Sequence, residues 1–233
     1  MKYNNQLEIQ YINRLKELLK QLPDICTDFF ISISQTTAIK TRLNYAYDLK
    51  LFFKYLTENI RYFKDKNILD INSEDLEKVT YKDIDRFLDY ISYHQTENIT
   101  KLGNITVINR INKENGKARK LCAIRRMFRY FYKVGEISFN PAELIETPKI
   151  HQKNIIYLDK NEVIKLLNEV ENGTKLTQKQ KLYHNYTKVR DFAIVCLLLG
   201  TGMRVSECVG INIQDIDFTK RGIKILRKGG NES

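Results

Sequence analysis

The stretch LLLGTGMRVSECVGI occupies residues 197–211 and continues an apolar run that precedes it. Two glycines bracket its first threonine, and glycine tolerates the backbone conformations that end a helix and turn the chain. We predict a buried helix that ends at these glycines. A new short helix would then begin at Arg204, with Val205 and Val209 facing inward. This arrangement would hold the Arg204 guanidinium at the edge of an apolar core, as in a phosphate clamp.

A second interpretation of Arg204 is an ordinary ion pair on a helix surface. Glu207 follows three residues later, which is the spacing of neighbours on one helix face. The residues alone leave both interpretations open.

Composition indicates a folded protein with room for two modest domains. Of 233 residues, 42% are hydrophobic and 11% aromatic. The N-terminus lacks the apolar core of a secretory signal, and the longest apolar run is far shorter than the ~20 residues of a membrane span. We therefore expect a cytoplasmic protein with no membrane partner. Four scattered cysteines without a C-x-x-C pair suggest buried reduced thiols and no metal or cofactor: Cys26, Cys122, Cys196 and Cys208.

Positive charge is concentrated in one part of the chain. The net charge is +11, and residues 110–153 hold eleven Lys or Arg against four Glu, whereas residues 58–97 carry an acidic excess. A confined basic zone suggests a polyanionic partner.

Apolar spacing predicts a mainly α-helical chain. Helical periodicity covers about residues 5–20, 37–57, 80–91 and 116–135. Thr80 and Asp83 have the spacing of a capping box at the start of the third of these helices. In the second helix, the face opposite the apolar one carries Lys40, Asn44, Tyr47 and Asp48. Pro141 and Pro148 then mark a semi-extended connector. Beyond the connector, Asp159 would cap a short helix, residues 171–188 would form a loop, and another helix would start at Thr187. The segments IQDIDF and GIKILR are expected to be short strands. The second domain is therefore predicted to be mixed α+β with a small sheet.

The helix over residues 116–135 has two different sides. Apolar residues recur on one, while Arg119, Arg126 and Lys133 repeat every seven residues on the other. A basic side can simply be a solvated surface, but Glu114 is the only acidic residue among residues 113–133. We therefore favour contact with phosphate groups.

Several segments together resemble the tyrosine recombinase (phage-type integrase) family. TGMRVSECVGINIQDID, residues 201–217, resembles the motif of the first catalytic arginine. Residues 41–56 and 115–149 are similar to helices of the family's DNA-binding domain and the linker after it, and ILRKGGNE, residues 225–232, is similar to the hairpin that carries a catalytic lysine.

The resemblance implies an organisation of the chain. An N-terminal helical extension would occupy residues 1–30, and a helical, SAM-like core-binding domain that contacts DNA residues 31–147. A linker would span residues 148–156, and the first part of the catalytic domain residues 157–233. The implied partner is double-stranded DNA, with self-association as a dimer or tetramer on it.

The resemblance also implies residue roles. Arg204 would bind the scissile phosphate, Glu207 would support it, and Lys228 would be the general acid toward the leaving 5′ oxygen, although Lys228 also suits an exposed turn and Arg227 is its neighbour. A tyrosine would form a 3′-phosphotyrosine without metal or cofactor. The expected DNA contacts are Lys40, Arg42, Asn44, Lys117, Arg119, Lys120, Arg125, Arg126, Arg129 and Lys133.

One departure from the family pattern concerns the nucleophile. All fourteen tyrosines precede Arg204, and no histidine has an arginine three residues later. We therefore expect a recombinase fragment that lacks the C-terminal nucleophile and binds DNA without cutting it. The alternatives are a non-catalytic DNA-binding remnant or regulator at a recombination site, and a basic RNA-binding or scaffold protein.

Overall fold

The computed structural model describes residues 3–99, 105–151 and 154–225. The chain forms two compact units, Met1–Gln152 and Lys153–Ser233. The fold is mainly helical with two small two-stranded sheets, which confirms the predicted fold class.

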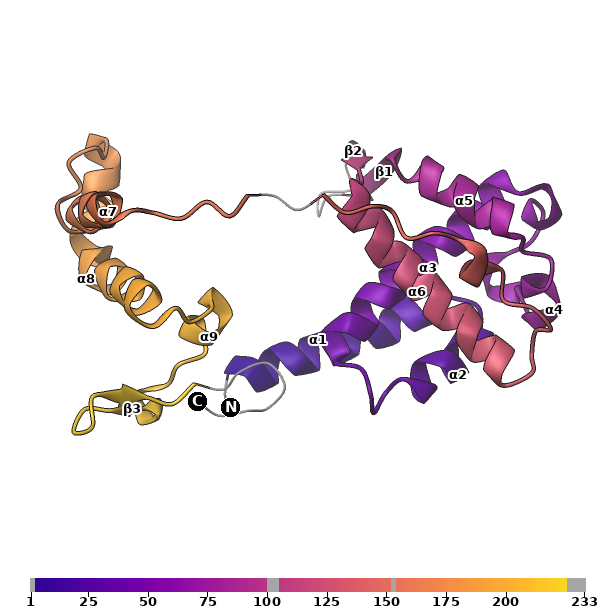
Figure 1. Ribbon diagram of the computed structural model, residues 1–233, viewed down its shortest axis with the longest axis horizontal. Coiled ribbons are helices and arrows are strands. Elements are labelled where there is room, and N and C mark those ends of the chain that lie inside the picture. The colour runs from indigo at the N-terminus through magenta and orange to yellow at the C-terminus, as the bar shows by residue number, and fades with distance from the viewer. Residues whose placement is uncertain (1–2, 100–104, 152–153, 226–233) are drawn as a thin grey trace. The chain divides into compact units, whose positions relative to one another are not determined.

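The first unit is a cluster of helices with one β-ribbon (Figure 1). Its α-helices are α1 (Tyr3–Leu19), α2 (Ile25–Ser32), α3 (Ile39–Asn59), α4 (Ser73–Leu76), α5 (Tyr81–Tyr90) and α6 (Glu114–Lys133). Short 3-10 helices are η1 (Arg61–Phe63), η2 (Ile68–Asp70) and η3 (Pro141–Leu144). Antiparallel strands β1 (Tyr93–Ile99) and β2 (Ile105–Ile111) form the ribbon, which the apolar periodicity did not predict.

Aromatic side chains build the centre of the first unit's core. Phe52 on α3 meets Phe87 on α5 at a ring-centroid distance of 5.2 Å and Phe128 on α6 at 6.4 Å, both edge to face. All three rings are fully buried. Burial of each large aromatic stabilises the fold by about 2–3 kcal/mol, so this triad joins three helices that are distant in sequence.

Helix starts follow the polar residues that sequence inspection singled out. The Thr80 backbone N–H donates to Asp83 Oδ2 at 2.9 Å, and Asp159 Oδ1 accepts from the Glu162 backbone N–H at 2.8 Å. Both are capping boxes, which satisfy backbone groups that have no partner within the helix. The predicted helix starts at these two positions are therefore confirmed.

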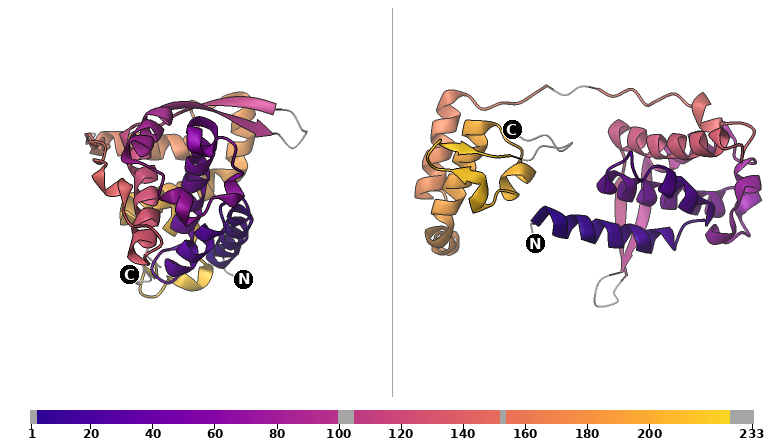
Figure 2. Two further views of the ribbon diagram at one scale, coloured as in Figure 1. Left: turned by 90° about the vertical axis from the view of Figure 1, so that its right-hand side faces the viewer. Right: turned by 90° about the horizontal axis from the view of Figure 1, so that it is seen from below.

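The second unit contains α7 (Lys160–Asn172), α8 (Gln178–Thr201), α9 (Val205–Val209), the 3-10 helix η4 (Ile213–Asp215) and strands β3 (Ile216–Asp217) and β4 (Gly222–Ile223). Figure 2 shows two further views of both units. The two strands pair antiparallel, with Ile216 opposite Ile223, and are shorter than predicted.

The start of α8 corrects the sequence interpretation. The helix begins at Gln178, nine residues before the predicted start at Thr187, so most of the expected loop is helical. Thr177 is its N-cap, and the Gln180 side chain accepts from the Thr177 backbone N–H at 2.9 Å. Thr177 and Gln180 form a capping box with the usual spacing of three residues, but the polar composition around them favoured a loop in the sequence interpretation.

Burial in the second unit also differs from expectation. None of the apolar run at residues 192–199 is fully buried. Val205 and Val209, predicted to face inward, are 66% and 58% exposed, because no described element covers that side of α9. Of the four cysteines, all free thiols, only Cys26 is buried, and Cys122 is exposed. No helix among the described residues has both the length and the apolarity of a membrane span.

Candidate functional site

The turn between α8 and α9 fixes the backbone of Arg204. Gly202 ends α8 with φ 62°, in the left-handed region that side-chain-bearing residues avoid. The next residue, Met203, is buried, and its backbone N–H donates to Thr201 Oγ1 at 3.2 Å. Arg204 follows in extended conformation as the residue that precedes α9. The predicted helix end and restart are thus present, with Gly202 as the terminating glycine.

Glu207 holds Arg204 at two points. Its Oε2 accepts from the Arg204 backbone N–H at 2.8 Å, and its Oε1 accepts from Arg204 Nη1 at 2.8 Å. The Glu207 side chain is 9% exposed, whereas that of Arg204 is 69% exposed. A single, nearly buried carboxylate therefore both caps the helix and orients the guanidinium. Since the guanidinium has five N–H donors, most of them remain available on its solvent side.

The ion-pair interpretation and the phosphate-clamp interpretation of Arg204 are compatible in this geometry. The pair with Glu207 exists at the i, i+3 spacing, yet it uses one edge of an exposed, forked cation. Lys228 and Arg227 lie outside the described residues.

Most cations of α6 are occupied within the first unit. Arg119 donates to the buried carboxylate of Asp48 on α3, and Lys120 Nζ, which is itself buried, donates to Asn112 Oδ1 at 2.8 Å. Arg126 Nη2 donates to Thr37 Oγ1 at 3.0 Å. These side chains tie α6 to other parts of the fold, which sequence spacing did not predict.

Arg125 and Arg129 reach the segment that follows α6. Arg125 Nε donates to the Ala142 carbonyl at 3.2 Å and Nη1 to Thr147 Oγ1 at 2.7 Å, and Nη2 donates to the Ile145 carbonyl. Arg129 makes a looser, exposed pair with Glu143 at 3.8 Å. The first arginine therefore has a structural role, whereas the second remains largely open to solvent.

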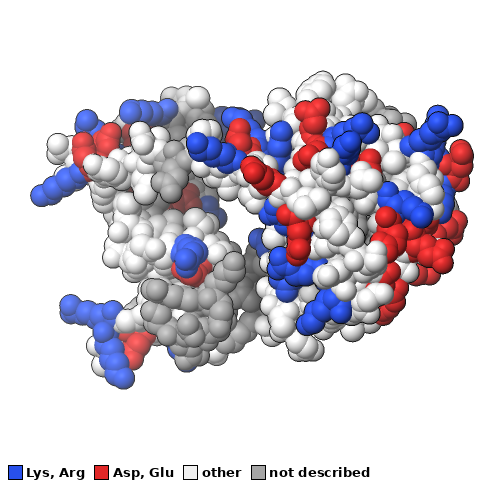
Figure 3. All heavy atoms as spheres, turned by 45° about the vertical axis from the view of Figure 1, so that its right-hand side comes forward, with Lys and Arg blue, Asp and Glu red and all other residues white. Residues whose placement is uncertain are grey.

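The remaining predicted DNA contacts are more accessible. Lys133, Lys40 and Asn44 are exposed and Lys117 is half-buried. Among the described residues, the side chains of Lys117 and Lys133 have no hydrogen bond or ion pair, while Arg42 Nε donates to the Thr37 carbonyl at 3.1 Å. On the face shown in Figure 3, acidic and basic side chains of the first unit are interspersed. As DNA contacts, all ten residues stay a prediction.

Asp48 is the strongest electrostatic departure from sequence expectation, which placed it on a polar helix face. Its side chain is 3% exposed. Burial raises the pKa of Asp48 to about 6, although the positive charges of Arg119 and Lys120 act in the opposite direction. The contact with Arg119 by itself would lower the pKa of Asp48. Desolvation of the carboxylate raises this pKa by more, because the Arg119 side chain is half-exposed.

Comparison with known proteins relates the chain to one family. The sequence model of the Phage integrase family matches residues 157–233, which contain Arg204 and Glu207. Tyrosine recombinase XerC of Caldanaerobacter subterraneus subsp. tengcongensis is 29% identical over 231 residues, covering 97% of this chain and 56% of the relative. Residues 157–233 are thus a phage integrase family domain, and nearly the whole chain is similar to tyrosine recombinases.

Other relatives show the same pattern. Tyrosine recombinase XerC of Pelobacter propionicus is 36% identical over 120 residues, which is 52% of this chain and 36% of the relative. Tyrosine recombinase XerS of Streptococcus thermophilus is 27% identical over 223 residues, which cover 82% of this chain and 59% of the relative. The chain spans about half the length of the curated relatives it matches.

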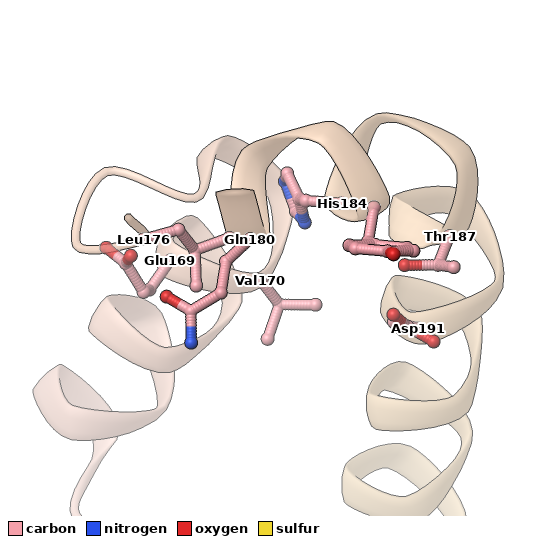
Figure 4. A pocket seen from close by; sticks show the side chains of 8 residues that line it. Glu169, Val170, Leu176, Gln180, His184, Thr187 and Asp191 are labelled. Atoms are coloured by element: carbon pink, nitrogen blue, oxygen red, sulfur yellow. The ribbon is translucent and has the colours of Figure 1, made fainter. Parts of the chain in front are cut away.

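One pocket of the second unit lies away from Arg204. It is formed where α7 meets α8, and Figure 4 shows its labelled side chains. The lining includes Glu169, His184 and Asp191, and a hydrogen bond from Thr187 and another from Arg190 lower the pKa of Asp191. Thr187 precedes the end of α8 by fourteen residues, about 20 Å along the helix. We therefore assign this pocket no part in the site at Arg204.

Proposed function

We propose that this chain supplies the DNA-binding part and the first active-site arginine of a site-specific tyrosine recombinase. The observation that carries the proposal is the exposed guanidinium of Arg204, held by the nearly buried Glu207 within the segment that matches the integrase family. A fixed, permanently charged fork presented to solvent suits recognition of a phosphate diester.

The proposed chemistry assigns a distinct task to each residue. Arg204 would donate hydrogen bonds to the non-bridging oxygens of the scissile phosphate and stabilise the charge that develops there in the transition state. Glu207 would orient Arg204 without touching DNA. Lys228 would protonate the leaving 5′ oxygen, and a tyrosine would form the 3′-phosphotyrosine from which the strand is rejoined.

The proposed partner is double-stranded DNA, which the protein would meet in the cytoplasm and on which copies of it would associate. The excess of positive charge in residues 110–153 supports this partner. A duplex is favoured over RNA because no recognised RNA-binding sequence pattern is present in the chain.

Equilibrium binding at several salt concentrations tests the proposal. The 233-residue chain is titrated against a fluorescent random-sequence duplex, with a structured RNA of equal length as competitor. We expect the logarithm of the binding constant to fall linearly with the logarithm of salt concentration, by roughly 0.9 per phosphate contact. Absence of duplex binding, or stronger binding to the RNA, would contradict the proposal.

A further inference from the structure

The ribbon β1–β2 has two unlike faces. Its register places His94 opposite Arg110 on one face and Gln95 opposite Asn109 on the other. Side chains alternate along a strand, so Tyr93 shares the second face. Figure 2 shows the ribbon projecting beyond the helices of the first unit.

The His94 face anchors the ribbon. His94 is 7% exposed, and its ring stacks on Tyr90 of α5 at 5.8 Å between centroids. Just after β2, Asn112 Nδ2 donates to the Ile91 carbonyl at 2.8 Å and its Oδ1 accepts from Lys120 of α6 at 2.8 Å. The base of the ribbon is thereby fixed against α5 and α6, and the opposite face is directed away from them.

The opposite face presents two amides in a defined orientation. Asn109 Oδ1 accepts from Tyr93 Oη at 3.2 Å and from Gln95 Nε2 at 3.2 Å. The Asn109 oxygen thus accepts two hydrogen bonds, which fixes the orientation of both amides. The Asn109 Nδ2 donors and the Gln95 Oε1 acceptor have no partner among the described residues. A hydrogen-bond donor therefore lies beside an acceptor on a solvent-exposed surface.

Three cations without ion pairs lie at the base of the ribbon, and one of them, Arg110, is on the same face as His94. Arg110 on β2 and Lys113 immediately before α6 are exposed, and Lys117 follows one turn into the helix. Within the described part of the chain none of the three contacts a carboxylate, unlike Arg119 further along α6. Three unneutralised positive charges at the base of a projecting ribbon complement the phosphate backbone of a duplex.

We propose that the ribbon β1–β2 enters the major groove of duplex DNA and that Gln95 and Asn109 read an adenine there. Two strands about 4.8 Å apart fit a groove about 12 Å wide. In that groove adenine offers the N7 acceptor beside the N6 donor, which matches the Asn109 donor and the Gln95 acceptor. Guanine offers two acceptors there and does not match. The inference rests on the proposed function, because it needs DNA as the partner.

A selection experiment with the whole chain tests the ribbon. Duplexes are selected from a random library by the wild-type chain and by the variant Gln95→Thr with Asn109→Thr, since threonine keeps the strand propensity. Adenines of the selected site are then replaced one at a time by 7-deazaadenine, which lacks the N7 acceptor. The matched control removes two exposed amides of α7, Asn161→Ala with Asn168→Ala.

We expect one 7-deazaadenine to weaken wild-type and control binding about 10-fold while leaving the threonine variant unaffected. The variant should keep the wild-type salt slope, which shows that it is folded and still holds the backbone. Equal responses of wild type and variant would overturn the ribbon assignment, as would a change in self-association with unchanged DNA recognition, which would make the ribbon a protein interface. Failure of the wild-type chain to bind any duplex would instead refute the proposed function.

Discussion

The guanidinium of Arg119 on α6 donates a hydrogen bond to the buried carboxylate of Asp48 on α3. The two residues are 71 positions apart, so this contact fastens two helices of the core. Removing one partner leaves the other charge without compensation in a poorly solvated position.

Arg119→Ala should therefore destabilise the first unit by about 2 kcal/mol, less than for a fully buried pair because Arg119 is half-exposed. Urea unfolding measures the free energy of unfolding. In a protein that already carries Asp48→Asn, Arg119→Ala should lower the free energy of unfolding much less. If Arg119→Ala lowers DNA affinity and leaves stability unchanged, the structural role is wrong.

The raised pKa of Asp48 predicts a pH dependence of stability. The ordinary pKa is 3.8 and the folded-state pKa is about 6, so the folded protein holds this proton more tightly than the unfolded chain. The contribution of Asp48 to the free energy of unfolding should therefore fall as pH rises from about 4, through the folded-state pKa, to about 7, by on the order of 2 kcal/mol, and stay constant above.

The difference in unfolding free energy between wild type and Asp48→Asn, followed across this pH range, isolates that contribution from the other carboxylates. A difference that grows in favour of wild type as pH rises would show that the Arg119 contact, and not burial, dominates.

Arg125 should matter more for stability than Arg129. Arg125 donates to two backbone carbonyls and a hydroxyl after α6, so Arg125→Ala should cost about 2–3 kcal/mol. Arg129→Ala is the matched control on the same helix, and its exposed pair should be worth less than about 1 kcal/mol. Thermal unfolding of both variants gives the comparison, and equal losses would refute the assignment.

The cations without internal partners should account for the salt dependence of DNA binding. Replacing Lys113, Lys117 and Lys133 together by Gln should reduce the slope of log binding constant against log salt by up to about 2.7. The control is Lys64, Lys78 and Lys82 replaced by Gln, which changes the net charge equally within the acidic part of the chain. Equal effects of the two triple variants would mean that net charge alone governs binding.

The parts of the fold that sequence predicted are those with local causes. The capping boxes at Thr80 and Asp159 and the pairing of Arg204 with Glu207 each depend on residues three positions apart. Periodicity likewise located most helices, because one face of each meets a core.

Long-range contacts explain what sequence analysis missed. Asp48 was placed on a polar face because its partner Arg119 is distant in sequence, and the same distance hid the structural use of Arg125. The ribbon has a weak sequence signature, since Gly103-Asn104 is a pair favoured between hairpin strands but the flanking residues alternate poorly. Which amides share its outer face depends on the register.

The most direct test of the account is a coupling measurement between Arg204 and a DNA phosphate. Wild type and Arg204→Ala are titrated against the selected duplex in which one phosphate at a time is replaced by an uncharged methylphosphonate. We predict one position at which the replacement weakens wild-type binding about 10-fold and has no effect on Arg204→Ala. If every position affects both proteins equally, Arg204 does not hold a phosphate and the proposed role is wrong.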